Sequence, residues 1–194
     1  MKFSNHLNSL LFLLFFSCQA GYASTPVKTV DVSKINRVEI TEKNDRLRLQ
    51  RTAGLLANYE IEAKKLIDMV DEGYPGVSIQ KKAEELMDLS ENVFDSAKFR
   101  LPQCEDYLTK SMELKDNINI ISHEDLEKNY HLDGALPKAP GECYHTKDLF
   151  VHPATVIVLT RDDPALSEAT KSSIKAEITE VLGHTEMVRQ LVIY

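Results

Sequence analysis

Apolar residues recur at helical spacing along most of this chain, and that pattern constrains the fold more than any other feature of the sequence. They line one face of a helix over residues 55–70, 79–97, 107–121 and 174–192, with charged residues on the other faces. Short or medium links separate these stripes, so consecutive helices should pack in opposite directions. The sequence therefore predicts an all-α fold, an antiparallel bundle of four to five helices.

Glycine, proline and capping residues mark where these helices should begin and end. Residues 73–76 contain two glycines and a proline and should end the first helix. Ser78 is expected to cap the second helix, and Pro102 to mark its end, with a third helix directly after it. Ser122 should begin a short helix. The pair Asp163–Pro164 joins a capping residue to a proline at the first helical position, and it should begin the last helix.

The segment between the third and last helices is harder to assign. Residues 132–142 contain two glycines and two prolines and are predicted to be a loop, longer than a minimal connection. The apolar run over residues 149–159 is apolar on every side of a helical wheel, so as a helix it would be central and buried, with Pro153 kinking or starting it. A short buried strand over residues 156–159 fits the pattern equally well.

The first 23 residues are predicted to be a signal peptide that is removed on export. Lys2 gives a short positive start, and residues 10–16 form an apolar core too short to span a membrane. Gly21 and Ala23 have the small side chains that a signal peptidase requires, so cleavage is expected after Ala23. The alternative is cleavage before Cys18 with lipid attachment, which the two phenylalanines near that position do not favour.

Export would place the mature chain in the periplasm of a bacterium or outside the cell. We expect an extended arm over residues 24–43 and a single helical-bundle domain over residues 44–194. The sequence has 30 acidic and 23 basic residues, a formal charge of −7, and loss of Lys2 with the leader would make it −8. This acidity argues against partners such as nucleic acid or an anionic membrane surface. The mature sequence also has no apolar run long enough to span a bilayer.

Two cysteines remain after removal of the leader, Cys104 and Cys143. In an exported chain such a pair predicts a disulfide, here one that staples the loop to the third helix. Closing a loop of roughly 40 residues should stabilise the fold by about 4 kcal/mol on the chain-entropy view. Thiolates for metal or redox chemistry are the alternative, which the absence of C-x-x-C spacing does not favour. The same absence argues against covalently attached haem.

His145, Asp148 and His152 form the sharpest cluster of potential metal ligands. On a helix they lie at positions i, i+3 and i+7, within about 60° of arc, so the three side chains can face one direction. Imidazole and carboxylate groups suit zinc, copper or iron, and His131 or Tyr144 could complete such a site from across the loop. The alternative is a core role, because the same face is apolar: buried histidines can pair with a carboxylate or a carbonyl, and the aspartate can pair with the lysine before it.

Haem is a less favoured cofactor. A helical bundle of this size can hold haem without a covalent link, through a histidine and either a methionine or a second histidine. The candidate ligands are His152 or His184 with Met69, Met87 or Met112. The methionines lie on or near apolar faces, where methionine usually fills the core. His184 itself is expected to be solvated or interfacial.

The sequence contains no nucleophile elbow, no H-E-x-x-H pair and no glycine-rich phosphate loop, so an enzyme is the least favoured class. Tyr130, His131 and Tyr144 flank the proline-rich loop that the disulfide would hold rigid. We therefore expect a non-enzymatic binding or accessory protein whose recognition surface is the segment from Tyr130 to His152, with a protein or small-ligand partner. The alternatives are a transition-metal-binding or haem-binding bundle, and a segment that serves only as a crossover. The last helix could also form a homodimer interface.

Overall fold

The computed structural model describes residues 29–194, and every regular element in that range is helical. Four long helices form the body of the protein: α1 (Lys43–Asp71), α2 (Gly76–Arg100), α6 (Glu142–Asp162) and α7 (Glu168–Val188). The prediction of an all-α bundle is confirmed. The predicted signal peptide, residues 1–23, lies outside the described residues.

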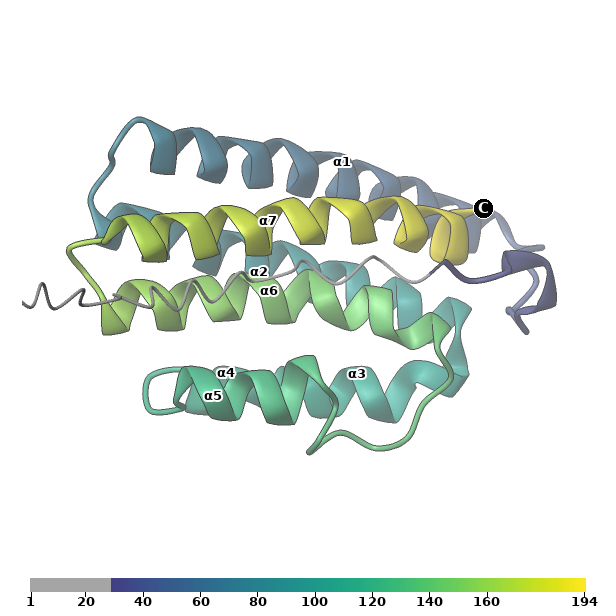
Figure 1. Cartoon of the computed structure of the whole chain (residues 1–194). Coiled ribbons are helices and arrows are strands. Elements are labelled where there is room, and N and C mark those ends of the chain that lie inside the picture. The colour runs from purple at the N-terminus through teal and green to yellow at the C-terminus, as the bar shows by residue number, and fades with distance from the viewer. Residues whose placement is uncertain (1–28) are drawn as a thin grey trace, which may run out of the picture.

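The four long helices form a square in which each is antiparallel to its neighbours (Figure 1). Short turns over residues 72–75 and 163–167 fold α1 against α2 and α6 against α7. The two hairpins pack together because α2 also contacts α6 and α1 also contacts α7. The apolar faces predicted from the sequence meet in one core, which includes Leu56, Tyr59, Phe94 and Phe150.

The chain between the two hairpins makes an excursion along one side of the bundle. It contains η2 (Pro102–Cys104), α3 (Glu105–Met112), α4 (Leu114–Asn117), α5 (His123–Leu126) and a one-turn π-helix, η3 (Glu127–His131). These elements lie against α6, so that α6 is placed between α7 and the excursion (Figure 1).

The third predicted helix is broken, and the prediction of one continuous helix to residue 121 was wrong. The break is at Glu113, whose N–H donates to the Lys110 carbonyl, and a second turn closes at Asn117, whose carbonyl accepts from Ile120 and Ile121. The apolar stripe continues across the first break, with Leu114 fully buried. The spacing of apolar residues therefore could not reveal the break at Glu113.

Two helix limits are confirmed. α1 ends at Asp71, and Gly73 adopts the left-handed conformation (φ 77°) that glycine favours after a helix. Ser122 caps α5, since its hydroxyl accepts a hydrogen bond of 3.0 Å from the Asp125 N–H.

Two other limits were predicted wrongly. α2 begins at Gly76 after Pro75, so Ser78 lies inside the helix and does not cap it. α7 begins at Glu168, with Ser167 as its cap, and not at the aspartate–proline pair. The carboxylate of Asp163 instead accepts from the Ser167 N–H (2.8 Å), which makes residues 163–167 a separate turn.

The run over residues 149–159 is helical, which settles the choice between helix and strand. It forms the middle of α6, and Pro153 neither starts nor ends that helix. A proline inside a helix leaves the carbonyl four residues earlier without its N–H donor, here that of Leu149. The buried hydroxyl of Tyr59 donates to this carbonyl at 2.7 Å. A side chain of α1 therefore replaces the hydrogen bond that the proline removes.

The predicted disulfide is present. Cys104 and Cys143 have Cα atoms 5.3 Å apart and join η2 to the first turn of α6. The loop predicted before α6 is also found, as the irregular residues 132–141. A disulfide between buried cysteines is typical of proteins from an oxidising compartment.

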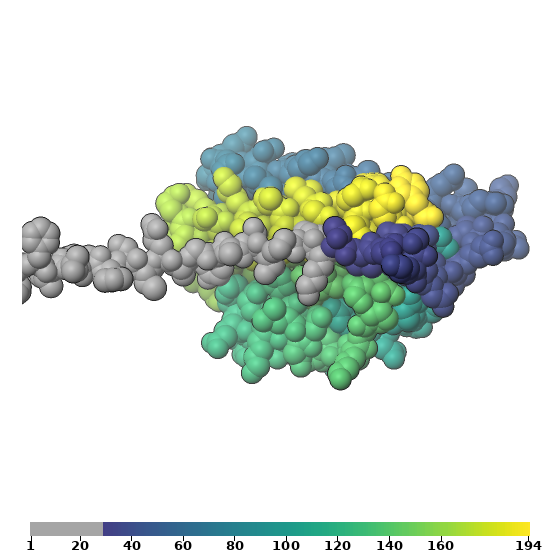
Figure 2. All heavy atoms as spheres, turned by 45° about the vertical axis from the view of Figure 1, so that its right-hand side comes forward, coloured from purple at the N-terminus to yellow at the C-terminus, as the bar shows by residue number. Residues whose placement is uncertain are grey.

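The N-terminal arm runs along one end of the bundle. Its described part, residues 29–42, contains one turn of 3-10 helix, η1 (Val32–Lys34). The Val38 N–H donates to the Arg100 carbonyl, and the Arg37 guanidinium donates to the carbonyl of Gln190. Figure 2 shows this arm beside the C-terminal end of the chain. Within the described part of the chain, no helix has both the length and the apolar character needed to cross a bilayer.

Candidate metal centre

The first three turns of α6 carry an unusual concentration of buried polar side chains. His145, Thr146, Lys147, Asp148 and His152 are all fully buried. They are buried because α6 is covered by α2, by α7 and by the excursion. Burying charged and imidazole groups is unfavourable unless each finds a partner, so their contacts determine what this part of the protein can do.

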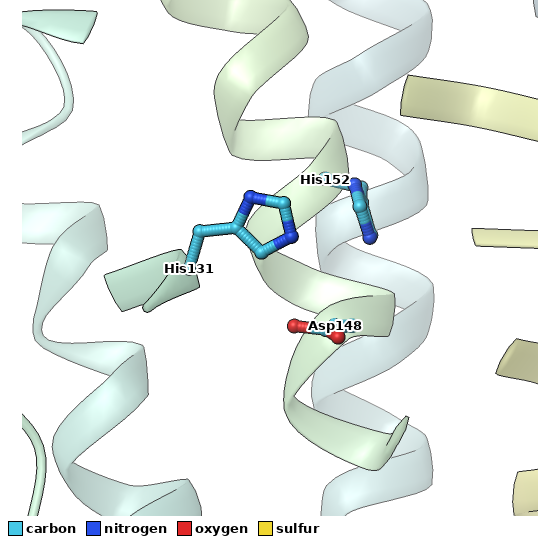
Figure 3. A group of neighbouring side chains, drawn as sticks. All are labelled: His131, Asp148 and His152. Atoms are coloured by element: carbon cyan, nitrogen blue, oxygen red, sulfur yellow. The ribbon is translucent and has the colours of Figure 1, made fainter. Parts of the chain in front are cut away.

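Three candidate ligands predicted from the sequence come together at this point. His131, Asp148 and His152 each place one potential ligand atom within 4.8 Å of the other two. Asp148 and His152 are one turn apart on α6, and His131 points toward them from η3 (Figure 3). The site thus joins the bundle to the excursion.

His145, the fourth candidate, lies elsewhere. It is seven residues before His152, which places the two about 10.5 Å apart along the helix axis, too far to share one ion readily. Its Nδ1 atom is 2.9 Å from Nδ1 of His184 on α7. The edge of the Tyr144 ring packs against both of these imidazoles. His145 is therefore in a position to support His184.

His184 is fully buried, so the expectation that it would be solvated or interfacial was wrong. It follows Val181 by three residues and precedes Val188 by four, so it belongs to the apolar stripe of α7, and this spacing was the missed signal. His184, Glu180 and His152 form a second group whose ligand atoms lie within 4.8 Å of one another. Sequence reasoning did not identify this group.

The methionines considered as haem ligands are part of the apolar core or pack against it. Met87 is buried in the core, and Met69 and Met112 are half-buried beside it. Each therefore has the filling role that is common for methionine.

Each of the three clustered histidines has a partner at Nδ1. The pairs are His131 with Glu127 (2.8 Å), His152 with Glu177 (2.7 Å) and His184 with His145 (2.9 Å). The Nε2 atoms of His152 and His184 are buried and have no hydrogen-bond partner. A supporting group at one nitrogen that leaves the other free is the usual arrangement around a metal-bound histidine.

Asp148 lies among these imidazoles. Its Oδ1 atom is 3.0 Å from Lys147 Nζ and its Oδ2 atom is 3.5 Å from His184 Nε2, but neither oxygen accepts a well-formed hydrogen bond. Burial alone would raise the pKa of Asp148, but the Lys147 ammonium and the imidazoles hold it below the ordinary value. Two ligand atoms on one tetrahedral zinc ion are about 3.3 Å apart, close to the spacing between Asp148 and His184.

Lys147 holds the excursion against the bundle. Its ammonium group donates to the carbonyls of Tyr130 and His131, both at 2.8 Å, and to Asp133 Oδ1 at 2.9 Å. The expected pairing of Asp148 with this lysine is present. Lys147 thus fixes the backbone that carries His131, and it also supplies one counter-charge to Asp148.

The two outer histidines differ in protonation. Burial would lower the pKa of His131, but the hydrogen bond to Glu127 and the charge of Asp148 outweigh it and raise the value to about 9. Burial lowers the pKa of His184 to about 3, and the neighbouring His152 adds to that effect. His184 is therefore neutral at pH 7, as ligation requires, whereas His131 would release a proton on binding an ion.

Acidic groups outnumber basic ones around this cluster. Glu127, Asp148, Glu177 and Glu180 all contact or adjoin the histidines, and Lys147 is the ammonium group among them. An excess of carboxyl groups beside nitrogen donors that are neutral once His131 has released its proton favours a cation over an anion.

The segment predicted as a recognition surface is only partly exposed. From residue 142 onward it forms α6, and His152 is fully buried. Tyr130, His131 and Tyr144 are half-buried. The exposed part is the loop over residues 132–141, with Leu132 at 75% exposure.

Comparisons of the chain with protein-family models, with curated proteins and with solved structures give no match.

Proposed function

We propose that this chain is an exported metal-binding protein that holds a divalent transition-metal ion between η3 and α6. His131, Asp148 and His152 are the ligands. The observation that carries the proposal is the convergence of buried ligand atoms: Nε2 of His152 has no hydrogen-bond partner, and Asp148 has the Lys147 ammonium as an ion-pair partner but no hydrogen bond at either oxygen. Buried polar atoms without hydrogen bonds are costly, and an ion would satisfy these atoms together.

The donor set selects the class of metal. Two imidazoles and one carboxylate suit zinc, copper and iron better than calcium or magnesium, which prefer oxygen ligands alone. Zinc is the first candidate because it tolerates mixed nitrogen and oxygen ligands in a compact site. The disulfide and the predicted leader support a role outside the cytosol, in the periplasm or the medium.

The test is metal binding by tag-free protein with the disulfide intact. We would strip the protein with EDTA, titrate it with Zn²⁺ by calorimetry, and record the visible spectrum of the Co²⁺ form. His152→Ala should weaken binding by more than about 100-fold, beyond the usual loss for a supporting residue. His123→Ala is the histidine control, because His123 is partly exposed, belongs to neither donor group, and lies 3.8 Å from Glu127, beyond hydrogen-bond distance.

The outcome is decisive in both directions. Tight Zn²⁺ binding by the parent and the control, with loss in His152→Ala, supports the proposal. Binding that is equally tight in all three proteins would place the ion elsewhere and refute the assignment. Circular dichroism of each variant would show that the helices are retained.

A second candidate is the binding or accessory role of the exposed loop. It is favoured by one observation: residues 132–141 are held at one end by the disulfide and at the other by Lys147, so that little entropy is lost on binding. Leu132→Ser with Lys138→Ala should then abolish cross-linking to a partner in the exported fraction while metal binding is unchanged. Cross-linking equal to that of the parent would exclude this loop.

A further inference from the structure

His152 belongs to two donor groups that extend in different directions. One contains His131 and Asp148, and the other contains Glu180 and His184. Neither group contains both His131 and His184. These two histidines come from η3 and from α7, and α6 lies between those elements (Figure 1).

One small ion would not use all of these donors. Bonds of about 2.0–2.2 Å keep the ligand atoms of a tetrahedral zinc ion about 3.3 Å apart, so a single sphere is filled by four atoms. The cluster offers five side chains: His131, Asp148, His152, Glu180 and His184. The number and spread of the donors therefore exceed what one tetrahedral ion needs.

The position of Asp148 links the two groups. Its Oδ2 atom is 3.5 Å from Nε2 of His184, so Asp148, a member of the first group, also reaches a member of the second. A carboxylate has two oxygens and can bind two ions at once. In two-metal sites the ions are about 3.5–4 Å apart, a spacing that a single bridging carboxylate can span.

The charge of the cluster also accommodates a second ion. Glu127 and Glu177 accept hydrogen bonds from or pair with His131 and His152, Asp148 pairs with Lys147, and Glu180 lies beside His152 and His184. A second dication would be drawn to the side where Glu177 and Glu180 lie, both on α7.

We infer that the centre binds two divalent transition-metal ions, the second one held by Glu180 and His184, with Asp148 bridging them. The first ion is bound by His131, His152 and Asp148, so the inference rests on the proposed function. Each ion then has three protein donors, counting the bridge, and keeps a position for water or another oxygen ligand.

The test is the stoichiometry of Zn²⁺ in EDTA-stripped protein, measured by equilibrium dialysis with elemental analysis. The parent and the control His123→Ala should bind two ions per chain. His184→Ala and Glu180→Gln should each bind one, and His131→Ala should also bind one. Far-ultraviolet circular dichroism and the urea midpoint would show that each variant is folded.

Other results would overturn the inference in distinguishable ways. One ion per parent chain, lost both in His131→Ala and in His184→Ala, would mean a single four-ligand site and would refute the second position alone. One ion per parent chain that is lost in His131→Ala but kept in His184→Ala would also refute the second position alone. Two ions retained in every variant would place them elsewhere on the surface. No binding by the parent would refute the proposed function as well.

Discussion

Replacing Lys147 by methionine tests how much of the stability of the fold depends on one buried ammonium group. The Lys147 side chain is 0% exposed and donates to the Tyr130 and His131 carbonyls and to Asp133, and it lies 3.0 Å from Asp148 Oδ1. Methionine has a similar length and fills the same space. The variant therefore removes the charge and the donors with little change in packing.

The expected loss follows from what the substitution leaves behind. Removing one partner of a buried ion pair leaves the other charge uncompensated, which typically costs about 3–5 kcal/mol. The two backbone carbonyls also lose a donor, at about 1–3 kcal/mol each if they stay buried, although such terms do not add fully. We expect the free energy of unfolding to fall by about 3–5 kcal/mol. For a domain of this size that lowers Tm by about 6–20 °C.

The assay is urea unfolding of oxidised, EDTA-treated protein, followed by circular dichroism. Lys115→Met is the matched control, since Lys115 also contacts two carboxylates, Asp88 at 2.9 Å and Glu91 at 2.6 Å. Its side chain is 49% exposed, however, and exposed pairs contribute about 0–1 kcal/mol. The difference between the two variants isolates the effect of burial.

A loss in Lys147→Met no larger than that of the control would refute this reasoning. A double variant provides a second check, because Lys147→Met with Asp148→Asn leaves no unpaired buried carboxylate; Asp133, the other carboxylate that Lys147 contacts, is 42% exposed. It should be more stable than Lys147→Met alone if the uncompensated carboxylate is the main cause. A double variant less stable than the single one would instead point to the lost carbonyl contacts.

Two further predictions concern the disulfide and the pH dependence. Replacing Cys104 and Cys143 by alanine should lower the free energy of unfolding by about 4 kcal/mol. The reason is that the unfolded chain gains conformational entropy when the cross-link between residues 39 apart in sequence is removed. A urea midpoint equal to that of the parent would contradict this. In the metal-free protein, the pKa of His184 falls from 6.5 to about 3 on folding, so its contribution, at most about 5 kcal/mol, is full above pH 6.5 and is lost as the pH falls toward 3. The pKa of His131 rises from 6.5 to about 9, so its contribution is full below pH 6.5 and is lost as the pH rises through 9. The urea midpoint should therefore be highest near pH 6.5. If the midpoint of His184→Phe falls below pH 6.5 as steeply as that of the parent, another group causes the loss of stability in acid.

The helices and the disulfide could be predicted from the sequence because both depend on local or compositional signals. A stripe of apolar residues specifies which face of a helix is buried, and two cysteines in an exported chain have only each other as partners. Residues 149–159 could not be assigned in this way, because α6 is buried on all sides and has no stripe. The hydroxyl that compensates for Pro153 belongs to Tyr59, more than 90 residues earlier.

The candidate site was predicted only in part, because only some of its residues are close together in the sequence. Asp148 and His152 are one turn apart, a spacing visible in the sequence, and His131 was placed near them by its position before the loop. His145 was grouped with them because positions i and i+7 share a face, but a shared face does not bring residues two turns apart within reach of one ion. The spacing of His184 could have predicted that it is buried, but its place beside Asp148 and His152 depends on which helix packs on α6, and sequence spacing does not contain that information.

The disulfide also changes what the polypeptide connection between the hairpins has to do. Cys104 follows the α1–α2 hairpin almost directly, and Cys143 lies in the first turn of α6, before most of the α6–α7 hairpin. The chain from Glu105 to Glu142 is therefore one arm of a covalent ring whose other arm is the sulfur bridge. Cutting any peptide bond in that arm leaves the two hairpins joined, and only cleavage together with reduction separates them. A nicked molecule would migrate as one species on a denaturing gel and as two once thiol is added.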